Sequence, residues 1–263
     1  MSSVYNINVQ CGGIRRAAEI GDLSMVKYLL SLDDPAAYNN AAICLAAERG
    51  HLSIVEILIA DPRVNPGDNN NRAIIVAAGG GHIEVVGVLL RDPRVDPSAQ
   101  NNSALSMASC KGCLTVVNRL LVDERVDPAA NSNYALRLAS LFGHLAVVNA
   151  LLADVRVDPS SYNNSAICVA VDNDRLDVAE RLLNDPRVDP SVRNNGPLRY
   201  ALLQNNYSLA THIVRKPGVY NSLTPEQNIV IPADIIKNIK EMTWKRRRHA
   251  VCAWAARRCF YIQ

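Results

Sequence analysis

Aromatic residues are scarce in this chain of 263 residues: they make up 5% of it, and only two are phenylalanines. Apolar residues make up 49%, so a core has to be built from alanine, leucine, valine and isoleucine. Sandwiches and barrels favour β-branched and aromatic residues, so this composition is more typical of close-packed helices. The length is sufficient for one large domain or two ordinary ones.

Long hydrophobic runs are also missing, since no apolar stretch approaches the roughly 18–20 residues that span a bilayer. The first ten residues, MSSVYNINVQ, have neither the basic nor the apolar region of a signal peptide. Seven cysteines, an odd number without framework spacing, favour a reducing compartment. We therefore expect no membrane association and a cytoplasmic protein, with the nucleus as an alternative and the host cytoplasm if a virus or parasite delivers it.

A strong charge of one sign is missing as well, because the net charge is only +3. Residues 221–263 hold eight Lys/Arg against three Asp/Glu, a charge of +5, which leaves −2 for residues 1–220. A slightly negative surface is the opposite of a phosphate-binding one. We therefore expect no nucleic acid on residues 1–220.

What the chain does have is a repeat of 31 residues. Alanines recur at this interval at Ala46, Ala77, Ala108, Ala139, Ala170 and Ala201. Asparagines do so at Asn40, Asn71, Asn102, Asn133, Asn164 and Asn195. Glycines keep the same interval at Gly50, Gly81, Gly112 and Gly143, and then give way to Asp174 and Asn205.

Each copy predicts two short helices joined by a tight turn. In one copy, AIIVAA (73–78) is a helix of small residues, and HIEVVGVLL (82–90) has apolar residues at helical spacing. Gly81 supplies the left-handed turn between them. Pro93 and Pro97 prevent the link that follows from continuing the helix. One helical hairpin cannot bury its apolar side alone, so the repeats predict an all-α solenoid of stacked copies.

The segments GHIEVVGVLL (81–90) and GHLAVVNALL (143–152) resemble the second helix of ankyrin repeats, and the Ala-x-x-x-Gly-His approach to them is similar too. The resemblance covers about residues 14–220, or seven copies, the first and last of them degenerate. It implies an ankyrin-type array over residues 1–220, followed by a tail or helical cap at 221–263. The family's Thr-Pro-Leu-His opening is replaced, for example by SALS (103–106), and only Pro197 keeps the proline.

The asparagine ladder has a structural interpretation. Asn102 and its equivalents precede the first helix, where asparagine is a strong N-cap. The asparagine one position earlier, such as Asn101, falls where the family uses glycine, and asparagine tolerates the left-handed conformation. The alternative is a polar groove for a peptide backbone.

No catalytic, cofactor or metal site is expected. Cys110 and Cys113 form a Cys-x-x-Cys pair, but a zinc site needs two more ligands nearby. The histidines His51, His82 and His144 occupy a turn position that the family uses for hydrogen bonding. The repeated Asp-Pro-Arg-Val-Asp links suggest alternating charges that bridge neighbouring links. A redox or metal protein built on the two cysteines remains an alternative.

The resemblance implies that a protein partner contacts the link tips and the variable positions of the first helices. These positions are Tyr38, Arg49, Arg72, Lys111, Tyr134, Leu141, Phe142, Tyr162, Asp172 and Arg193. Phe142 is unusual, because a bulky ring stands directly before a Gly-His turn. An apolar centre with a polar rim is typical of an interface. The alternative is that Phe142 packs over the neighbouring helix.

The tail, residues 221–263, allows several hypotheses besides a capping helix pair. The candidate interaction residues are Trp244, Lys245, Arg246, Arg247, Arg248 and Trp254. The basic cluster suggests nuclear import or anion contact, and a basic helix with two tryptophans suggests a calmodulin-like target. IPADIIKNI (231–239) is similar to the opening of F-box domains, which implies a ubiquitin-ligase component as a second partner. The favoured function is a non-catalytic protein-interaction module, with a cullin-ligase adaptor and a nuclear or calmodulin-binding regulator as alternatives.

Overall fold

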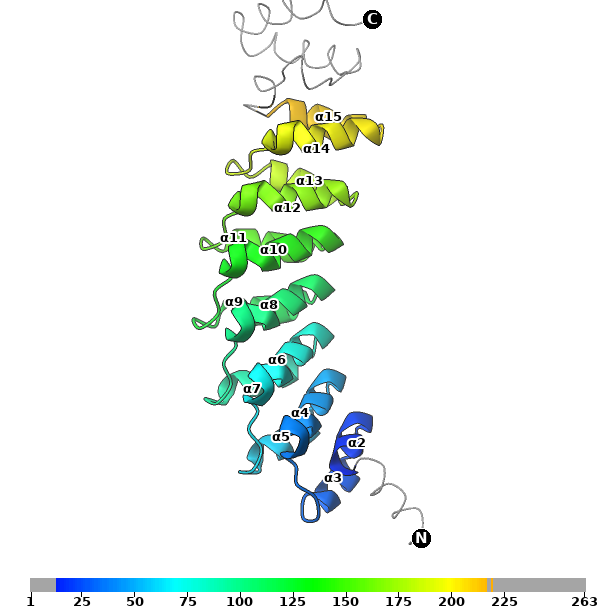
Figure 1. Ribbon diagram of the computed structural model, residues 1–263, viewed down its shortest axis with the longest axis vertical. Coiled ribbons are helices and arrows are strands. Elements are labelled where there is room, and N and C mark those ends of the chain that lie inside the picture. Colours follow the sequence, from blue (N-terminus) through cyan, green and yellow to red (C-terminus); the bar gives the residue numbers. More distant parts are fainter. Residues whose placement is uncertain (1–12, 217–218, 220–263) are drawn as a thin grey trace, which may run out of the picture. The chain divides into compact units, whose positions relative to one another are not determined.

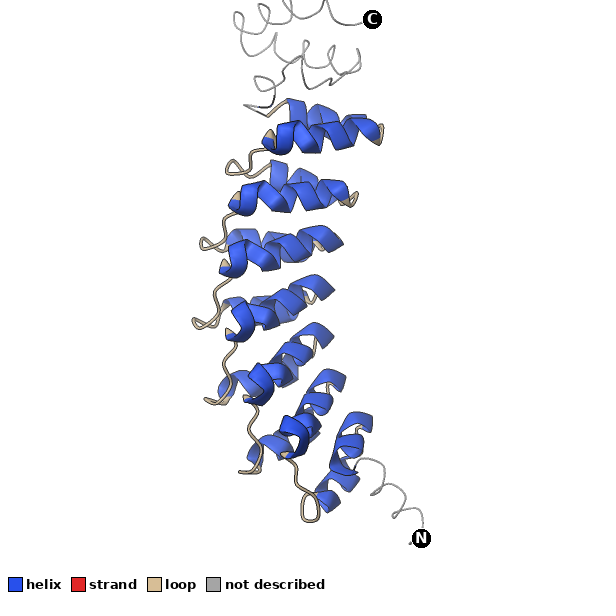
Figure 2. Cartoon of the chain, in the orientation of Figure 1, coloured by secondary structure: helices blue, strands red, loops and turns tan. Residues whose placement is uncertain are grey.

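The computed structural model describes residues 13–216 and residue 219, and every regular element within that range is a helix (Figures 1 and 2). The chain forms two compact units, Met1–Asp158 and Pro159–Gln263. This division falls inside the repeated region. The predicted boundary between residues 220 and 221 lies outside the described residues and stays a prediction.

The first unit contains ten of the described helices. The helix that opens each copy is called its first helix, and in this unit the first helices are α2 (Gly13–Ile20), α4 (Ala37–Arg49), α6 (Asp68–Gly80), α8 (Ala99–Lys111) and α10 (Ala130–Phe142). Its second helices are α3 (Leu23–Leu29), α5 (Leu52–Ala60), α7 (Ile83–Arg91), α9 (Leu114–Leu121) and α11 (Leu145–Ala153). First helices pack on first helices and second on second, in sequence order (Figure 1). The predicted all-α solenoid of stacked copies is confirmed.

A glycine in the left-handed conformation ends each first helix of the first unit. At Gly81 φ is +76°, and the amides of Gly81 and His82 bond back to the carbonyls of Ala78 and Ala77 at 3.2 and 3.1 Å. These bonds satisfy carbonyls that the helix end would otherwise leave without partners. The chain therefore reverses within two residues, which lays α7 against α6.

The core is built from small and branched residues, as the scarcity of aromatic residues predicts. Ala77 and Ala108 are fully buried, so α6 and α8 approach closely, while Val86 and Leu89 fill the layer of the second helices. From Val64 onward, each link between two repeats contributes one further buried valine, for example Val95 at 1% exposure. A core of this kind depends on contact between copies, which is why the repeats stack.

The asparagine ladder folds differently from the N-cap prediction. Near the start of α4, α6, α8 and α10, three consecutive residues are left-handed, as in Gln100, Asn101 and Asn102 with φ of +53°, +57° and +60°. Asn102 is 6% exposed, and its Oδ1 accepts a 2.9 Å hydrogen bond from the amide of Asp127, 25 residues ahead. The N-cap prediction is wrong because this side chain bonds to the next link rather than to its own helix. The left-handed conformation predicted for Asn101 is confirmed.

The link arginines also bond differently from the prediction. Arg125 forms a bidentate pair with Asp123 of its own link, at 2.9 Å from Nε and 2.8 Å from Nη2. The same guanidinium donates to the carbonyls of Val95 and Leu90 in the preceding copy, both at 3.0 Å. The ion pair therefore lies within one link, while the charged arginine does bridge to the preceding link. An arginine that its aspartate holds in place thus joins two copies through backbone carbonyls.

Replacing Arg125 with alanine is expected to lower the free energy of unfolding by about 1–2 kcal/mol at pH 7, since Arg125 is 41% exposed and solvent weakens its bonds. Arg125 lowers the pKa of the Asp123 carboxyl through their hydrogen bonds. A carboxyl with a lowered pKa stabilises the fold above its unfolded pKa of about 3.9, and the effect is lost as the pH falls further. Urea unfolding at pH 7 and pH 3 should show the difference between variant and parent shrinking at pH 3. An equal difference at both values would contradict the role of the pair.

The second unit repeats the design with altered turns. Its helices are α12 (Ser161–Asp172), α13 (Leu176–Leu183), α14 (Val192–Leu203) and α15 (Tyr207–Val214). Asp174, with φ of +55°, takes the left-handed turn position that glycine holds in the first unit. Asn206 replaces the turn histidine, and its side chain accepts from the amide of Leu209 at 3.1 Å. The asparagine-to-link bond persists between Asn164 and Asp189 at 2.7 Å.

Candidate partner-binding surface

The turn histidines are structural. The Nε2 of His144 lies 2.9 Å from the carbonyl oxygen of Cys110, which is in the last turn of α8 in the preceding copy. His82 bonds in the same way to Glu48 at 2.9 Å, and His51 to Glu19 at 3.1 Å. Each ring thus joins adjacent copies and satisfies a helix-end carbonyl, which agrees with the hydrogen-bonding role implied by the resemblance.

Cys113 stands where the other copies have histidine. Its Sγ lies 3.9 Å from the carbonyl oxygen of Gly79, the atom that a histidine would reach. Burial raises the pKa of this thiol, which disfavours the reactive thiolate. Within residues 13–216, no three His, Cys, Asp or Glu side chains gather as metal ligands. Cys113 therefore belongs to the series of turn residues that join adjacent copies.

Replacing Cys113 with histidine is expected to raise the free energy of unfolding by about 0.5–1.5 kcal/mol, because a weak thiol contact becomes a full hydrogen bond to Gly79. The ring has room, since Gly81 lies beside Cys113 as Gly112 lies beside His144. Chemical denaturation of both chains measures the difference. A Cys113→Ser variant serves as control and should not stabilise. Equal unfolding midpoints for the Cys113→His and Cys113→Ser variants would contradict this role of the turn residue.

A half-exposed group of apolar side chains lies on α8 and α10. On α10, Leu138 lies about one helical turn after Tyr134, and Leu141 and Phe142 lie about one turn after Leu138. The four residues therefore share one side of the helix. Met107 on α8 occupies the repeat position of Leu138 one copy earlier, and α8 packs against α10. Exposure is 37% for Met107, 38% for Tyr134 and 44% for Phe142. We call these five residues the apolar face.

Phe142 lies at a position that the scaffold does not need to fill with a ring. The equivalent residues in the first unit are Ile20, Arg49, Gly80 and Lys111, and each precedes a left-handed glycine. The Phe142 ring stacks on His144 of its own turn, with centroids 6.4 Å apart and planes at 26°. Since glycine supports the same turn, the fold does not explain the phenylalanine. Packing of the ring over the neighbouring helix, the alternative to an interface, is not tested by this contact.

Positive charges border the apolar face. Lys111 on α8 stands directly before Gly112, at the repeat position that Phe142 holds on α10. Arg72 on α6 holds the repeat position of Tyr134, two copies earlier. Arg137 lies over the Tyr134 ring, with its guanidinium carbon 5.2 Å from the ring centroid, in a cation–π contact. An apolar centre with a charged border is the composition of many protein interfaces.

Comparison with protein families agrees with this architecture. The sequence model described as Ankyrin repeats (3 copies) matches residues 14–101 and 105–194. The chain belongs to the ankyrin-repeat family. A comparison with curated protein sequences finds no match. Ankyrin repeats are generally modules for protein–protein interaction and typically non-catalytic, so a protein partner is the expectation that membership supports.

Within the ankyrin array, some predicted contact residues lie away from the apolar face. Tyr38, 75% exposed on α4, contacts Arg15, whose guanidinium carbon is 4.4 Å from the ring centroid. Arg49, also on α4, bonds to Glu19 at 3.3 Å. The structure thus brings Tyr134, Leu141 and Phe142 together on one ankyrin repeat, with Lys111 and Arg72 on the two before it, and leaves Tyr38 and Arg49 near the first helix.

Three predicted contact residues belong to the second unit of the ankyrin array. Tyr162 is 65% exposed in the left-handed segment near the start of α12, with φ of +54°. Asp172 and Arg193 form an exposed ion pair at 3.7 Å. An exposed pair of this kind contributes about 0–1 kcal/mol. These residues are therefore not assigned to the apolar face.

Two members of the apolar face, Met107 and Leu138, are absent from the sequence-based prediction. Both stand one position before the repeated alanine, where the other copies of the first unit have Leu45 and Val76. An ankyrin scaffold would be expected to bury such a row. The sequence did carry a signal for them. Leu138 stands three residues before Leu141 and Met107 four residues before Lys111, and such spacings place two residues on the same side of a helix.

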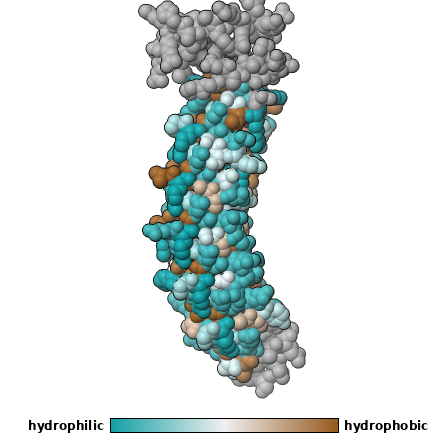
Figure 3. Space-filling model, turned by 60° about the vertical axis from the view of Figure 1, so that its left-hand side comes forward, coloured by the Kyte–Doolittle hydropathy of each residue, from teal (hydrophilic) through white to brown (hydrophobic). Residues whose placement is uncertain are grey.

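The link side of the ankyrin array differs from the apolar face. Figure 3, turned to bring that side forward, draws a mostly hydrophilic surface with small separate hydrophobic patches. Val122 and Val155 are 76% and 94% exposed at the links. Single exposed apolar residues are normal on protein surfaces. The link tips therefore offer less apolar surface for a partner than the prediction implied.

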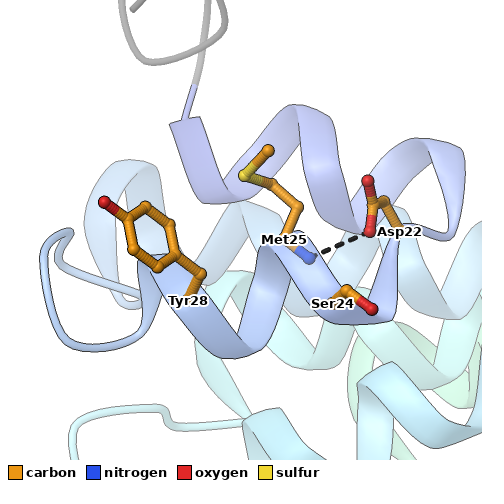
Figure 4. Close-up of a pocket in the computed structure, with 4 residues that line it drawn as sticks. All are labelled: Asp22, Ser24, Met25 and Tyr28. Carbon is orange, nitrogen blue, oxygen red and sulfur yellow. Dashed lines mark hydrogen bonds between the residues drawn. The ribbon is translucent and has the colours of Figure 1, made fainter. Parts of the chain in front are cut away.

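One pocket, with a volume of about 350 Å³, lies at the first ankyrin repeat and is lined by Asp22, Ser24, Met25 and Tyr28 (Figure 4). Asp22 is the N-cap of α3, and its Oδ1 accepts from the amide of Met25 at 2.9 Å. The carboxylate is thus used by the fold.

No helix among the described residues is long and apolar enough to cross a membrane.

Proposed function

We propose that the apolar face binds a partner protein and that the chain acts as a non-catalytic interaction module. The observation that carries the proposal is Phe142, a ring 44% exposed at a position where the same scaffold accepts glycine, isoleucine, arginine or lysine. Stability of the fold gives no reason for an aromatic residue there. Burial against a partner does, because aromatic residues are the most frequent energetic centres of interfaces.

The neighbours of Phe142 strengthen the proposal. Leu138, Leu141 and Tyr134 extend the apolar surface along α10, and Met107 extends it onto α8. A continuous surface allows water to be excluded around the central ring, which is the condition under which a buried aromatic residue contributes most. Lys111 and Arg72 supply the charged rim, where contacts add specificity and speed of association rather than much affinity.

Phe142→Ala is expected to weaken partner binding about 30-fold, equivalent to about 2 kcal/mol. The measurement begins with affinity capture from a cell lysate by the full chain and continues with titration of the captured, purified protein against each variant. Val155→Ala is the matched control, since it removes an apolar side chain that is 94% exposed in a link of the same unit.

The two variants give the opposite pattern if the partner binds the links, and no effect if it binds another surface. Binding that survives Phe142→Ala and fails with Val155→Ala would place the interface on the links. Binding that both variants leave intact would remove the first unit's apolar face from the account.

The adaptor and regulator functions depend on residues 221–263. Trp244, the cluster Lys245 to Arg248, and Trp254 lie outside the described residues, so the predicted cap, nuclear-import, calmodulin and ubiquitin-ligase roles stay predictions. Truncation after residue 220 tests them together. A ligase component that the full chain captures and the truncated chain does not would support the adaptor hypothesis without changing the proposal for the apolar face.

A further inference from the structure

The first helices that carry the apolar face have an unequal charge distribution. Helices α8 and α10 contain Lys111 and Arg137 and no acidic residue. Helix α6 contains Arg72 and one acidic residue, Asp68. The Asp68 carboxylate accepts hydrogen bonds from the side-chain amides of Asn40, at 2.5 Å, and Asn65. The cations at the border therefore have no acidic side chain on their own three helices except one that the fold already uses.

Acidic groups on the neighbouring links are also engaged. Asp96 accepts a hydrogen bond from the amide of Ser98 at 2.9 Å, and Asp127 accepts one from the amide of Ala129 at 2.9 Å. On the far side of α6, Glu48 is exposed on α4 beside Arg49. Helices α8 and α10 themselves thus carry two cations and no carboxylate, although residues 1–220 as a whole carry −2. A ligand of complementary charge for this surface is acidic.

The dimensions of the apolar face suit a helix. Tyr134 and Phe142 are eight residues apart on α10, which corresponds to about 12 Å along its axis and matches the roughly 10–12 Å diameter of a helix with side chains. Packed helices such as α6, α8 and α10 lie about 8–10 Å apart. A helix laid across them advances about 10.5 Å in seven residues, so one apolar residue per two turns meets successive repeats.

An extended peptide fits this surface less well. An extended ligand that binds by strand addition pairs its backbone with an exposed strand edge, and residues 13–216 contain no strand. The asparagine ladder might replace such an edge, but its side chains are already used by the fold. Asn102 and Asn133 accept hydrogen bonds from link amides at 2.9 and 3.1 Å. The chain's own tail is an unsuitable ligand as well, because residues 221–263 carry +5 and would be repelled by Arg72, Lys111 and Arg137.

We propose that the partner presents an acidic amphipathic helix, with apolar residues against Met107, Leu138 and Phe142 and acidic residues against Lys111 and Arg72. This inference rests on the proposed function, because it describes what the same surface binds. It adds the charge and the conformation of the ligand. The interaction should therefore weaken with ionic strength, and reversal of Lys111 should weaken it more than removal of its charge.

The test is selection of displayed random 16-residue peptides on the full chain, with removal of peptides that also bind the Phe142→Ala chain. The expected peptides are rich in Asp and Glu and carry apolar residues at helical spacing. Their affinity, measured by fluorescence anisotropy, should fall at least tenfold with Phe142→Ala and at least fivefold with Lys111→Glu. Lys27→Glu, an exposed lysine on α3, is the matched control and should have no effect.

The outcomes separate this inference from the proposed function. Selected peptides that depend on Phe142 but are neutral or basic would overturn the acidic-helix proposal and leave the apolar face as a binding site. Acidic peptides that show no helical signal in circular dichroism when bound would overturn the helical conformation. A selection without any peptide that depends on Phe142 would count against both the ligand and the surface.

Discussion

Replacing Asn102 with alanine is expected to lower the free energy of unfolding by about 2–4 kcal/mol. Two effects add: an alanine at φ of +60° costs about 1–2 kcal/mol, and the buried amide of Asp127 loses its hydrogen bond at about 1–2 kcal/mol. Urea unfolding monitored by circular dichroism measures the sum. No other single change discussed for the asparagine ladder removes both features.

Two companion variants separate these effects. Asn102→Gly removes the hydrogen bond but accepts the left-handed conformation, so its expected cost is about 1–2 kcal/mol, close to the hydrogen-bond part alone. Asn102→Asp keeps an acceptor oxygen and should cost less than alanine. If glycine and alanine destabilise the chain equally, the left-handed conformation contributes nothing and the account of the ladder is wrong in that part.

Replacing Gly112 with alanine is expected to cost about 2–4 kcal/mol, because two constraints meet at this turn. The residue has φ of +74°, and an added Cβ would lie 2.7 Å from Nδ1 of His144, so the ring would have to move away from the carbonyl of Cys110. The result is strain and the loss of a hydrogen bond between copies. Thermal and urea unfolding of the variant measure the cost.

Gly81→Ala is the matched control for Gly112→Ala. Its φ of +76° is almost the same, but its neighbour is Cys113, with Sγ at 3.1 Å from the added Cβ. The expected cost is about 1–2 kcal/mol, from the conformation alone. A cost for Gly81→Ala as large as that for Gly112→Ala would show that the histidine ring is not the source of the difference.

Much of the fold could be predicted from the sequence because its signals are periodic. The spacing of Ala46, Ala77 and Ala108 gives the stacked first helices, and Gly81 before His82 gives the turn. The bonds between copies could not be derived in the same way. Asn102 was interpreted as a cap for its own helix, whereas its partner lies 25 residues ahead and is brought near only by stacking.

The candidate surface was predicted in part for a similar reason. Phe142 stood out because a scaffold position that holds Gly80 and Lys111 in other copies has no need of a ring. Met107 and Leu138 did not stand out, since leucine or methionine on a helix usually indicates the core. Their half-exposed state depends on which side of the first helix faces the second helices, and that is set by packing rather than by the local sequence.

The measurement that tests the central claim most directly is the stability of Phe142→Ala alongside its affinity for the captured partner. The account predicts an unfolding free energy within about 0.5 kcal/mol of the parent, as for surface substitutions in general, together with the expected loss of affinity. An unfolding free energy reduced by about 2 kcal/mol or more, with affinity lost only in proportion to unfolded chain, would assign Phe142 to packing and contradict the proposed interface.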